Sequence, residues 1–219
     1  MLLEGQGRLS QAIELYDDAL AKEQTSLILS RRRIAAIKST GDTKRTLEAL
    51  NAHLDTFYND PEAWQELAEV YASQGLYAQS AFALEEVLLQ IPQNNFFHLK
   101  YAETLYTNGD VVKAFKAYLR VLELCQSDGG ATEEQSVSKQ SVAQGPWLRA
   151  LWGTKIATIA LIATPPASWK NSTTEDTVDQ AKVKKIDELV TNLLLNKVYT
   201  PQAVSAKHLR DVARAVLAA

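Results

Sequence analysis

A glycine recurs every 34 residues through the first half of the chain, at Gly7, Gly41, Gly75 and Gly109. Other positions keep their character at the same stride. Large apolar residues recur as Leu20, Leu54, Leu88 and Leu122, and small residues recur as Ala12, Thr46, Ser80 and Ala114. A fixed period of this length indicates a repeat protein, in which each unit buries its apolar face only against its neighbours.

The repeat at residues 61–94 preserves the pattern best. Its apolar and small residues follow the tetratricopeptide (TPR) signature, which reads Trp64, Leu67, Ala68, Tyr71, Ser80, Leu84 and Pro92. Asp60 is placed to cap a first helix that opens at Pro61, and Gly75 is placed to end it. We therefore predict two short helices per repeat, joined at the glycine, with Trp64 in the core.

The predicted fold is all-α, a TPR right-handed superhelical solenoid with additional C-terminal helices and roughly ten helices in total. TPR repeats are expected over 1–125, with the first one incomplete. A flexible polar loop is expected at 126–145, and a helical continuation of the solenoid at 146–219 with a polar loop at 164–176. In the 34-residue register Met1 falls in the middle of a first helix, so we expect the chain to be part of a longer protein.

Composition narrows the classes of function. A net charge of −3 gives no general attraction for nucleic acid. The single cysteine, Cys125, excludes an internal disulfide framework and fits a reducing compartment, and we expect it to be a small core residue. The most apolar segment, 147–163, contains Arg149 and Lys155 and is too short to span a bilayer. We predict that it forms a buried helix of the solenoid rather than a membrane span.

No catalytic, metal or cofactor site is predicted. His53, His98 and His208 are far apart in the sequence, and none lies in a metal-binding motif. The first two occupy packing positions of the repeat, which favours a structural role. No nucleophile, base and orienting group can be assigned, so an enzyme is not expected.

The run Arg31-Arg32-Arg33 is the densest cluster of positive charge. Successive residues on a helix point in different directions, so only part of the run can face the groove of the solenoid. We expect the rest to face solvent or an acidic surface of a partner. The run has no interleaved aromatic residues and is poor evidence for nucleic-acid binding.

Proteins of this kind bind partners on the concave face, which is lined by the first helix of each repeat. The register predicts that this face carries Ile28, Arg31, Ala35 and Lys38, then Glu62, Gln65, Glu69 and Ala72, then Phe96, Leu99, Glu103 and Tyr106. It would be basic at one end, acidic in the middle and aromatic at the other. The aromatic end either forms an exposed apolar patch that needs a partner or is covered by the C-terminal helices.

A free adaptor that binds a peptide or helix in this groove is the main alternative to a structural subunit. Adaptors for chaperone tails resemble one another in a basic, asparagine-containing clamp for a terminal carboxylate. Here Ala35, Glu69 and Glu103 occupy the positions where the asparagine would be expected. The sequence therefore argues against this type of adaptor.

Four stretches carry a family resemblance, and their non-consensus residues agree as well. They are LYDDAL (15–20), EAWQELAEVYASQGLYAQSAFALEEVL (62–88), YAETLYTNGD (101–110) and RALWG (149–153). Together they resemble the family of subunit 2 of the ER membrane protein complex, as a fungal-type or otherwise divergent member. The resemblance covers about residues 10–160 of the chain.

This resemblance implies a non-enzymatic scaffold on the cytosolic face of the endoplasmic reticulum, peripheral to the membrane and not spanning it. In that family the solenoid cradles cytosolic parts of the membrane subunits, including the Oxa/YidC-like insertase subunit, and can carry an MPN-fold subunit. The assembly inserts tail-anchored and multipass membrane proteins. The family has no compact contact motif, so the residues proposed above for the concave face rest on the repeat register alone.

Overall fold

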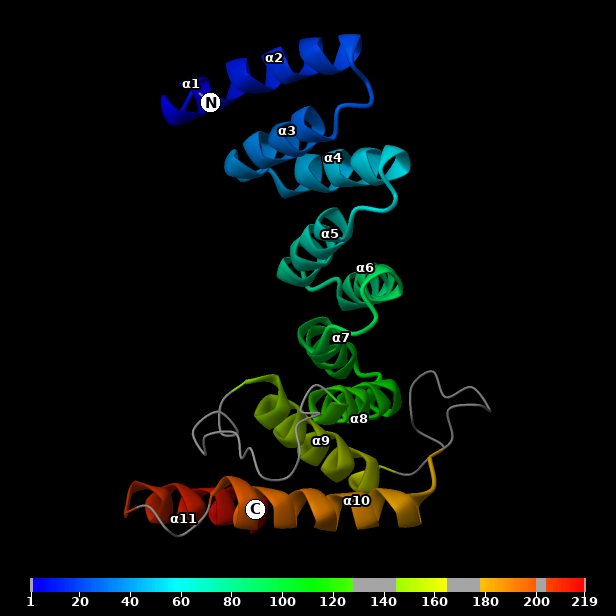
Figure 1. The fold of residues 1–219 in the computed structure, drawn as a ribbon, viewed down its shortest axis with the longest axis vertical. Helices are drawn as coiled ribbons and strands as arrows, with labels where there is room; N and C mark the ends of the chain where they lie inside the picture. Colours follow the sequence, from blue (N-terminus) through cyan, green and yellow to red (C-terminus); the bar gives the residue numbers. More distant parts are fainter. Residues whose placement is uncertain (1, 128–144, 165–177, 200–203, 219) are drawn as a thin grey trace. The chain divides into compact units, whose positions relative to one another are not determined.

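The computed structural model describes residues 2–127, 145–164, 178–199 and 204–218, and every regular element among them is helical. The chain divides into two compact units, Met1–Pro92 and Gln93–Ala219 (Figure 1). The first contains α1 (Leu2–Gly5), α2 (Leu9–Lys22), α3 (Leu27–Ser39), α4 (Thr43–Thr56), α5 (Pro61–Ser73) and α6 (Tyr77–Gln90). The second contains α7 (Asn95–Asn108), α8 (Val111–Ser127), α9 (Pro146–Ala163), α10 (Gln180–Leu193), the π-helical η3 (Leu194–Val198) and α11 (Val204–Ala218).

The four hinge glycines lie at equivalent bends of successive hairpins, as predicted. Gly7, Gly41, Gly75 and Gly109 have φ angles of 73°, 79°, 73° and 90°. Glycine adopts this left-handed conformation without the steric cost that a side chain would bring. Each glycine amide donates a hydrogen bond of 3.0 Å to the carbonyl three residues earlier. The 34-residue period therefore corresponds to one hairpin.

The small residues of the repeat are all buried. Ala12, Thr46, Ser80 and Ala114 each have exposed fractions of 3% or less. The hydroxyl of Ser80 donates a 2.8 Å hydrogen bond to the carbonyl of Ala68 and so joins the two helices of the α5–α6 hairpin. The 34-residue period therefore marks the positions at which each hairpin requires a small side chain, in addition to the positions of the bends.

The start of α5 follows the sequence prediction closely. The carboxylate of Asp60 accepts hydrogen bonds from two backbone amides of the first turn, and Pro61 occupies the first helical position. Trp64 is buried, and its indole N–H donates to the carbonyl of Tyr58 at 2.8 Å. The predicted core role of Trp64 is confirmed.

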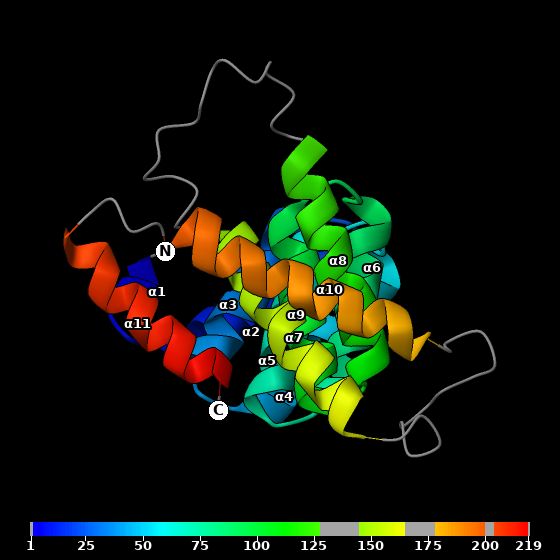
Figure 2. The ribbon, with the colours of Figure 1, turned by 90° about the horizontal axis from the view of Figure 1, so that it is seen from below.

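In the second unit, α9 packs against the α7–α8 hairpin, and α10 lies over α9 (Figure 2). Gly153 of α9 faces the ring of Tyr118 of α8, where an added Cβ atom would lie 2.3 Å from the nearest ring carbon. Only glycine permits this approach of the two helices. Burial raises the pKa of the Tyr118 hydroxyl to about 12.

A buried polar cluster joins α9 to α10. The ammonium group of Lys155 lies 2.8 Å from both carboxylate oxygens of Asp187 and 3.0 Å from the hydroxyl of Thr191. The hydroxyl of Thr158 donates to the same carboxylate at 2.6 Å. Lys155, which interrupts the apolar run in the sequence, therefore has its charge matched inside the unit.

The predicted burial of the apolar segment is confirmed for one face of α9 only. Ala150, Leu151, Ala157 and Leu161 are enclosed, whereas Ile156, Ile159 and Ile162 have exposed fractions of 47%, 50% and 40%. Leu151 also forms a core cluster with Val190 and Leu194. Among the residues that the structure describes, no helix combines the length and the apolar character needed to cross a membrane.

The C-terminal helices include a face that the core does not use. On α11, Leu209, Val212 and Val216 are about half exposed, whereas Ala213 is buried. Most of both predicted polar loops falls outside the described residues, so their flexibility and the boundaries at 125 and 145 stay predictions. The fold itself is confirmed as an all-α TPR-type solenoid.

Candidate partner-binding surface

The first-helix face of the first unit is organised around Arg31 of α3. Its Nε atom donates to a carboxylate oxygen of Asp60 at 2.8 Å, and its terminal nitrogens bind the other oxygen of Asp60 and the carboxylate of Glu62. Burial alone would raise the pKa of Asp60. Hydrogen bonds from Arg31, His53 and the amide of Ala63 outweigh that effect and hold the pKa below its ordinary value.

The other two arginines of the run also pair with carboxylates of the same unit. Arg32 lies 3.6 Å from the carboxylate of Glu4 in α1, and Arg33 pairs with Asp17 in α2. The three consecutive arginines thus reach three different helices of their own unit. The prediction that part of the run faces away from the groove holds, but the acidic surface that it meets belongs to the same chain.

Further along the same face, Lys38 donates to Glu66 at 2.6 Å, and the Gln65 amide donates to Glu69 at 3.0 Å. The ion pairs of Arg31 and Lys38 therefore join α3, in the basic repeat, to α5, in the acidic repeat. Such exposed pairs contribute little to stability individually, but they fix the charged groups of this face in place.

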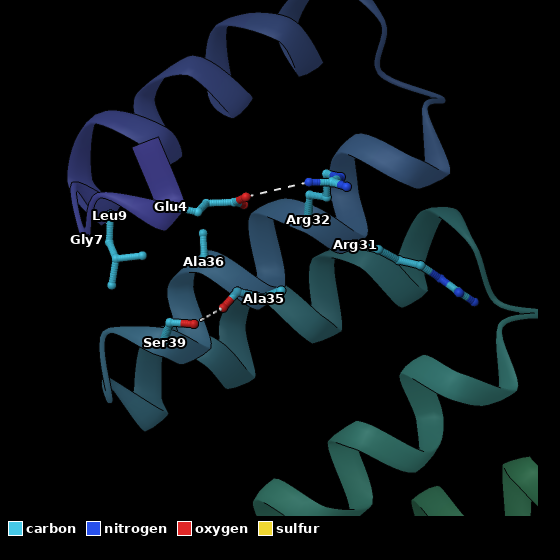
Figure 3. Close-up of a pocket in the computed structure, with 8 residues that line it drawn as sticks. All are labelled: Glu4, Gly7, Leu9, Arg31, Arg32, Ala35, Ala36 and Ser39. Atoms are coloured by element: carbon cyan, nitrogen blue, oxygen red, sulfur yellow. Dashed lines mark hydrogen bonds and ion pairs between the residues drawn. The ribbon is translucent and has the colours of Figure 1, made fainter. Parts of the chain in front are cut away.

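A cleft of about 610 Å³ opens on this face beside α1 and α3 (Figure 3). Ala35 and Ser39 contribute to its lining, and Leu9 approaches from the start of α2 (Figure 3). Arg31 also lines the cleft, although its guanidinium extends away toward α5 (Figure 3). The predicted surface residues Arg31 and Ala35 thus lie at one concavity, which mixes small apolar groups with charges.

One constellation escaped the sequence analysis. Ser30 Oγ lies 2.7 Å from Nδ1 of His53, and Nε2 of His53 lies 2.9 Å from Asp60. These are the residue types of a hydrolytic triad, yet the His53 side chain has an exposed fraction of 0%, and Asp60 is already bound by Arg31 and by the amides of α5. No substrate can reach the imidazole in this arrangement. The cluster holds the start of α5 against α3 and α4, which agrees with the structural role predicted for His53.

In the second unit, the prediction for Leu99 is wrong. Its exposed fraction is 1%, and it belongs to the core rather than to the surface. Phe96 is 42% exposed and lies under the Lys100 ammonium, 5.1 Å from the ring centroid, while Tyr106 is half-buried. The three residues therefore do not form one exposed patch. The register assigned Leu99 to the groove because it could not show how α8 and α9 surround α7.

Glu103 is not a free acidic group of the groove either. Its two carboxylate oxygens accept hydrogen bonds of 2.7 and 2.8 Å from Arg149 of α9. This ion pair links α9 to α7. It also accounts for the basic residue at position 149 within the apolar run. The other predicted surface residues, Glu62, Gln65 and Glu69, lie on α5 with at least partly exposed side chains.

The described residues contain no group of three or more His, Cys, Asp or Glu side chains arranged to hold a metal ion. His53 and His98 fall in different compact units, and the side chain of His208 lies outside the described residues. Cys125 is half-buried, 3.6 Å from the side-chain amide of Asn95. The chemistry of this chain, as far as it is described, is that of ion pairs and packed apolar surfaces.

Comparison with known proteins assigns the repeats to a family. Residues 1–109 match the family model of the EMC2 TPR-like repeat domain. Over these residues the chain belongs to the EMC2 family. The matched residues include all four hinge glycines, and Gly109 is the last residue of the match.

Two relatives extend the EMC2 likeness beyond residue 109. The ER membrane protein complex subunit 2-A of Xenopus laevis is 33% identical over 167 residues, which cover 76% of the chain and 51% of the frog protein. The TPR repeat protein oca3 of Schizosaccharomyces pombe is 34% identical over 133 residues, covering 58% of the chain and 46% of oca3. The chain thus spans about half the length of the curated relatives that it matches.

A solved structure supports the fold of this EMC2-type chain. The crystal structure of MamA protein aligns with a TM-score of 0.54 at 13% identity, covering 92% of the chain and 91% of MamA. At this identity the likeness concerns the helical repeat architecture alone.

Proposed function

We propose that the chain is a non-enzymatic scaffold subunit of the ER membrane protein complex. The match of residues 1–109 to the EMC2 TPR-like repeat domain carries this proposal. The printed names of the Xenopus relatives support it, because each is a subunit 2 of that complex. A solenoid that offers extended helical surfaces suits the assembly of several partners better than chemistry at one site.

In this role the chain sits on the cytosolic face of the endoplasmic reticulum as a peripheral subunit. Its partners are the other subunits of the complex, among them the Oxa/YidC-like insertase subunit and an MPN-fold subunit. The assembly inserts tail-anchored and multipass membrane proteins, and the solenoid organises the cytosolic parts of the insertase. The predicted residues of the first-helix face are proposed contacts, with Leu99 excluded.

Copurification tests this proposal. The tagged natural protein should elute in a large complex from detergent-solubilised ER membranes together with an Oxa/YidC-like subunit. It should also be released from membranes by alkaline carbonate, as a peripheral subunit is. Recovery of the protein only as a free cytosolic monomer would reject the proposal.

A matched pair of variants tests the proposed face. Ala35 lines the cleft of α3 and Ala52 lies exposed on α4, so Ala35→Arg fills the cleft, whereas Ala52→Arg adds the same side chain elsewhere. Arginine is a good helix former, so neither change should unfold its helix. We expect Ala35→Arg to release partner subunits and Ala52→Arg to retain them. Equal copurification of both variants would remove this cleft from the interface.

The alternative is a free adaptor that binds a peptide or helix, and the cleft of about 610 Å³ is the observation in its favour. Against it, Arg31, Arg32 and Lys38 are already paired within the unit. Reversal of Glu103 to lysine would break an internal contact with Arg149 and does not test peptide binding cleanly. The elution of the native protein, as a monomer or within a membrane complex, separates the two functions.

A further inference from the structure

A second concavity lies away from the first-helix face of the first unit. It is a groove of about 340 Å³ to which α4, α5 and α6 all contribute. Its lining from α5 consists of Trp64, Leu67 and Tyr71, while Asn51 of α4 and Phe82 of α6 contribute from either side. We call this site the α4–α6 groove.

The exposed ring of Phe82 gives the α4–α6 groove an apolar surface that a partner could bury. The side chain of Phe82 is 56% exposed, although its ring packs edge-on against Trp64 with 6.2 Å between the centroids. A large apolar residue placed in the groove would contact both rings and would remove the Phe82 ring from water. Grooves of this kind take the anchor residues of a helix or an extended segment.

The sequence around the groove is acidic after Lys44 and Arg45, which lie in the first turn of α4. Between Arg45 and Lys100 there is no lysine or arginine, whereas there are eight aspartates and glutamates. On the first-helix face, Arg31 pairs with Asp60 and Glu62, and Lys38 pairs with Glu66. Of the other acidic residues, Glu48 and Asp55 lie on α4 and Glu86 lies on α6, the helices that border the groove.

These three acidic residues follow the groove at helical spacing. Glu48 and Asp55 lie one turn before and one turn after Asn51 on α4, and both are exposed. Glu86 lies one turn after Phe82 on α6 and accepts a hydrogen bond from the hydroxyl of Tyr58. The apolar groove is therefore bordered by negative charge along both helices.

We propose that the α4–α6 groove binds a basic amphipathic segment of a partner protein. One large apolar side chain of that segment would lie over Trp64 and against Phe82, and its lysines or arginines would face the acidic residues of α4 and α6. Apolar burial supplies most of the affinity, while the charges determine orientation and exclude acidic segments. This surface is distinct from the first-helix face, so the inference goes beyond the proposed scaffold role.

Peptide binding to the full chain tests the proposal. The probe is a fluorescein-labelled, 18-residue amphipathic helix with leucine on one face and lysine on the other. Its counterpart carries glutamate at every lysine position, and binding is followed by fluorescence anisotropy. We expect the basic peptide to bind, with an affinity that falls as salt rises, and the acidic peptide not to bind.

Matched variants locate the site of binding. Phe82→Ala should weaken the basic peptide about tenfold, as expected for loss of an anchor contact. Leu15→Ala removes an apolar side chain that is 58% exposed on α2, outside both proposed binding surfaces, and should leave binding unchanged. Circular dichroism checks that each variant is folded. Asn51→Lys places a cation at the edge of the groove without removing an apolar contact, and it should also weaken the basic peptide.

Three outcomes would overturn the proposal. They are the absence of binding by the basic peptide, equal binding of the basic and acidic peptides, and equal loss of affinity in Phe82→Ala and Leu15→Ala. None of these outcomes affects the scaffold role, which depends on copurification of the native protein with its complex.

Discussion

Replacement of Gly153 by alanine tests the packing of α9 on α8 directly. The added Cβ atom would lie 2.3, 2.5 and 2.7 Å from three ring carbons of Tyr118. Carbon atoms pack best at about 3.5–4.0 Å, so the methyl group would be roughly 1 Å too close to the ring. Tyr118 is buried and cannot move its ring into solvent, so relief requires that α8 and α9 separate.

The expected size of the effect follows from two opposing terms. Alanine in place of glycine within a helix normally stabilises a protein by about 0.5–1 kcal/mol. Overpacking of a buried contact costs about 1–3 kcal/mol. We therefore expect Gly153→Ala to lower the free energy of unfolding by roughly 1–2 kcal/mol, or Tm by roughly 2–8 °C for a chain of this length.

The assay is urea and thermal unfolding followed by circular dichroism. Gly5→Ala is the control, because an added Cβ atom at that helical glycine meets nothing within 4 Å. In a Tyr118→Leu background the ring is absent, and Gly153→Ala should then cost nothing. The reasoning fails if Gly153→Ala is as stable as the parent chain, or if the substitution costs the same in both backgrounds.

Three further predictions concern buried ionisable groups. Lys155→Met alone should lower the free energy of unfolding by about 3–5 kcal/mol, because it leaves the buried charge of Asp187 without its partner. The double variant Lys155→Met with Asp187→Leu should recover most of this loss in urea unfolding. Additive losses from the two substitutions would contradict a coupled pair. The pKa of Asp60 is lowered by folding, so the stability it contributes is present above its ordinary pKa near 4 and is lost as pH falls through the lower folded value. The stability gap between the parent and Asp60→Asn, measured by urea midpoints from pH 7 to pH 3, should accordingly narrow below about pH 4, and a constant gap would refute the assignment. The pKa of Tyr118 is raised to about 12, so its contribution is present below the ordinary pKa near 10 and is lost as pH rises toward 12. Tyr118→Phe should therefore gain stability relative to the parent in unfolding at pH 11 compared with pH 9, and an unchanged difference would show that the hydroxyl is not buried.

Local features of the fold could be predicted from the sequence. The bends at Gly41 and Gly75, the cap at Asp60 and the start of α5 at Pro61 all depend on the conformational preferences of one or two residues. Such preferences act within a few residues and hold in any hairpin of this length. The burial of Trp64 followed from helical spacing, because a repeated hairpin has one apolar side to cover.

The candidate surface was predicted less well, because each exposed position depends on its neighbours in space. The register placed Leu99 and Glu103 in the groove, yet Leu99 is enclosed and Glu103 binds Arg149, 46 residues later in the chain. No spacing rule predicts contacts that depend on where α9 lies against α7. The cluster around His53 was missed for the same reason, since its members come from α3, α4 and the start of α5.

The sequence alone determined the repeat, the hairpin bends and the all-α class, because helix caps, left-handed glycines and apolar spacing act over short stretches of chain. Only the tertiary structure decided which charges of the first-helix face are already paired, that Gly153 admits the ring of Tyr118, and that Phe82 remains exposed beside a groove. These outcomes depend on distances between helices, which are set by the packing of whole side chains against one another.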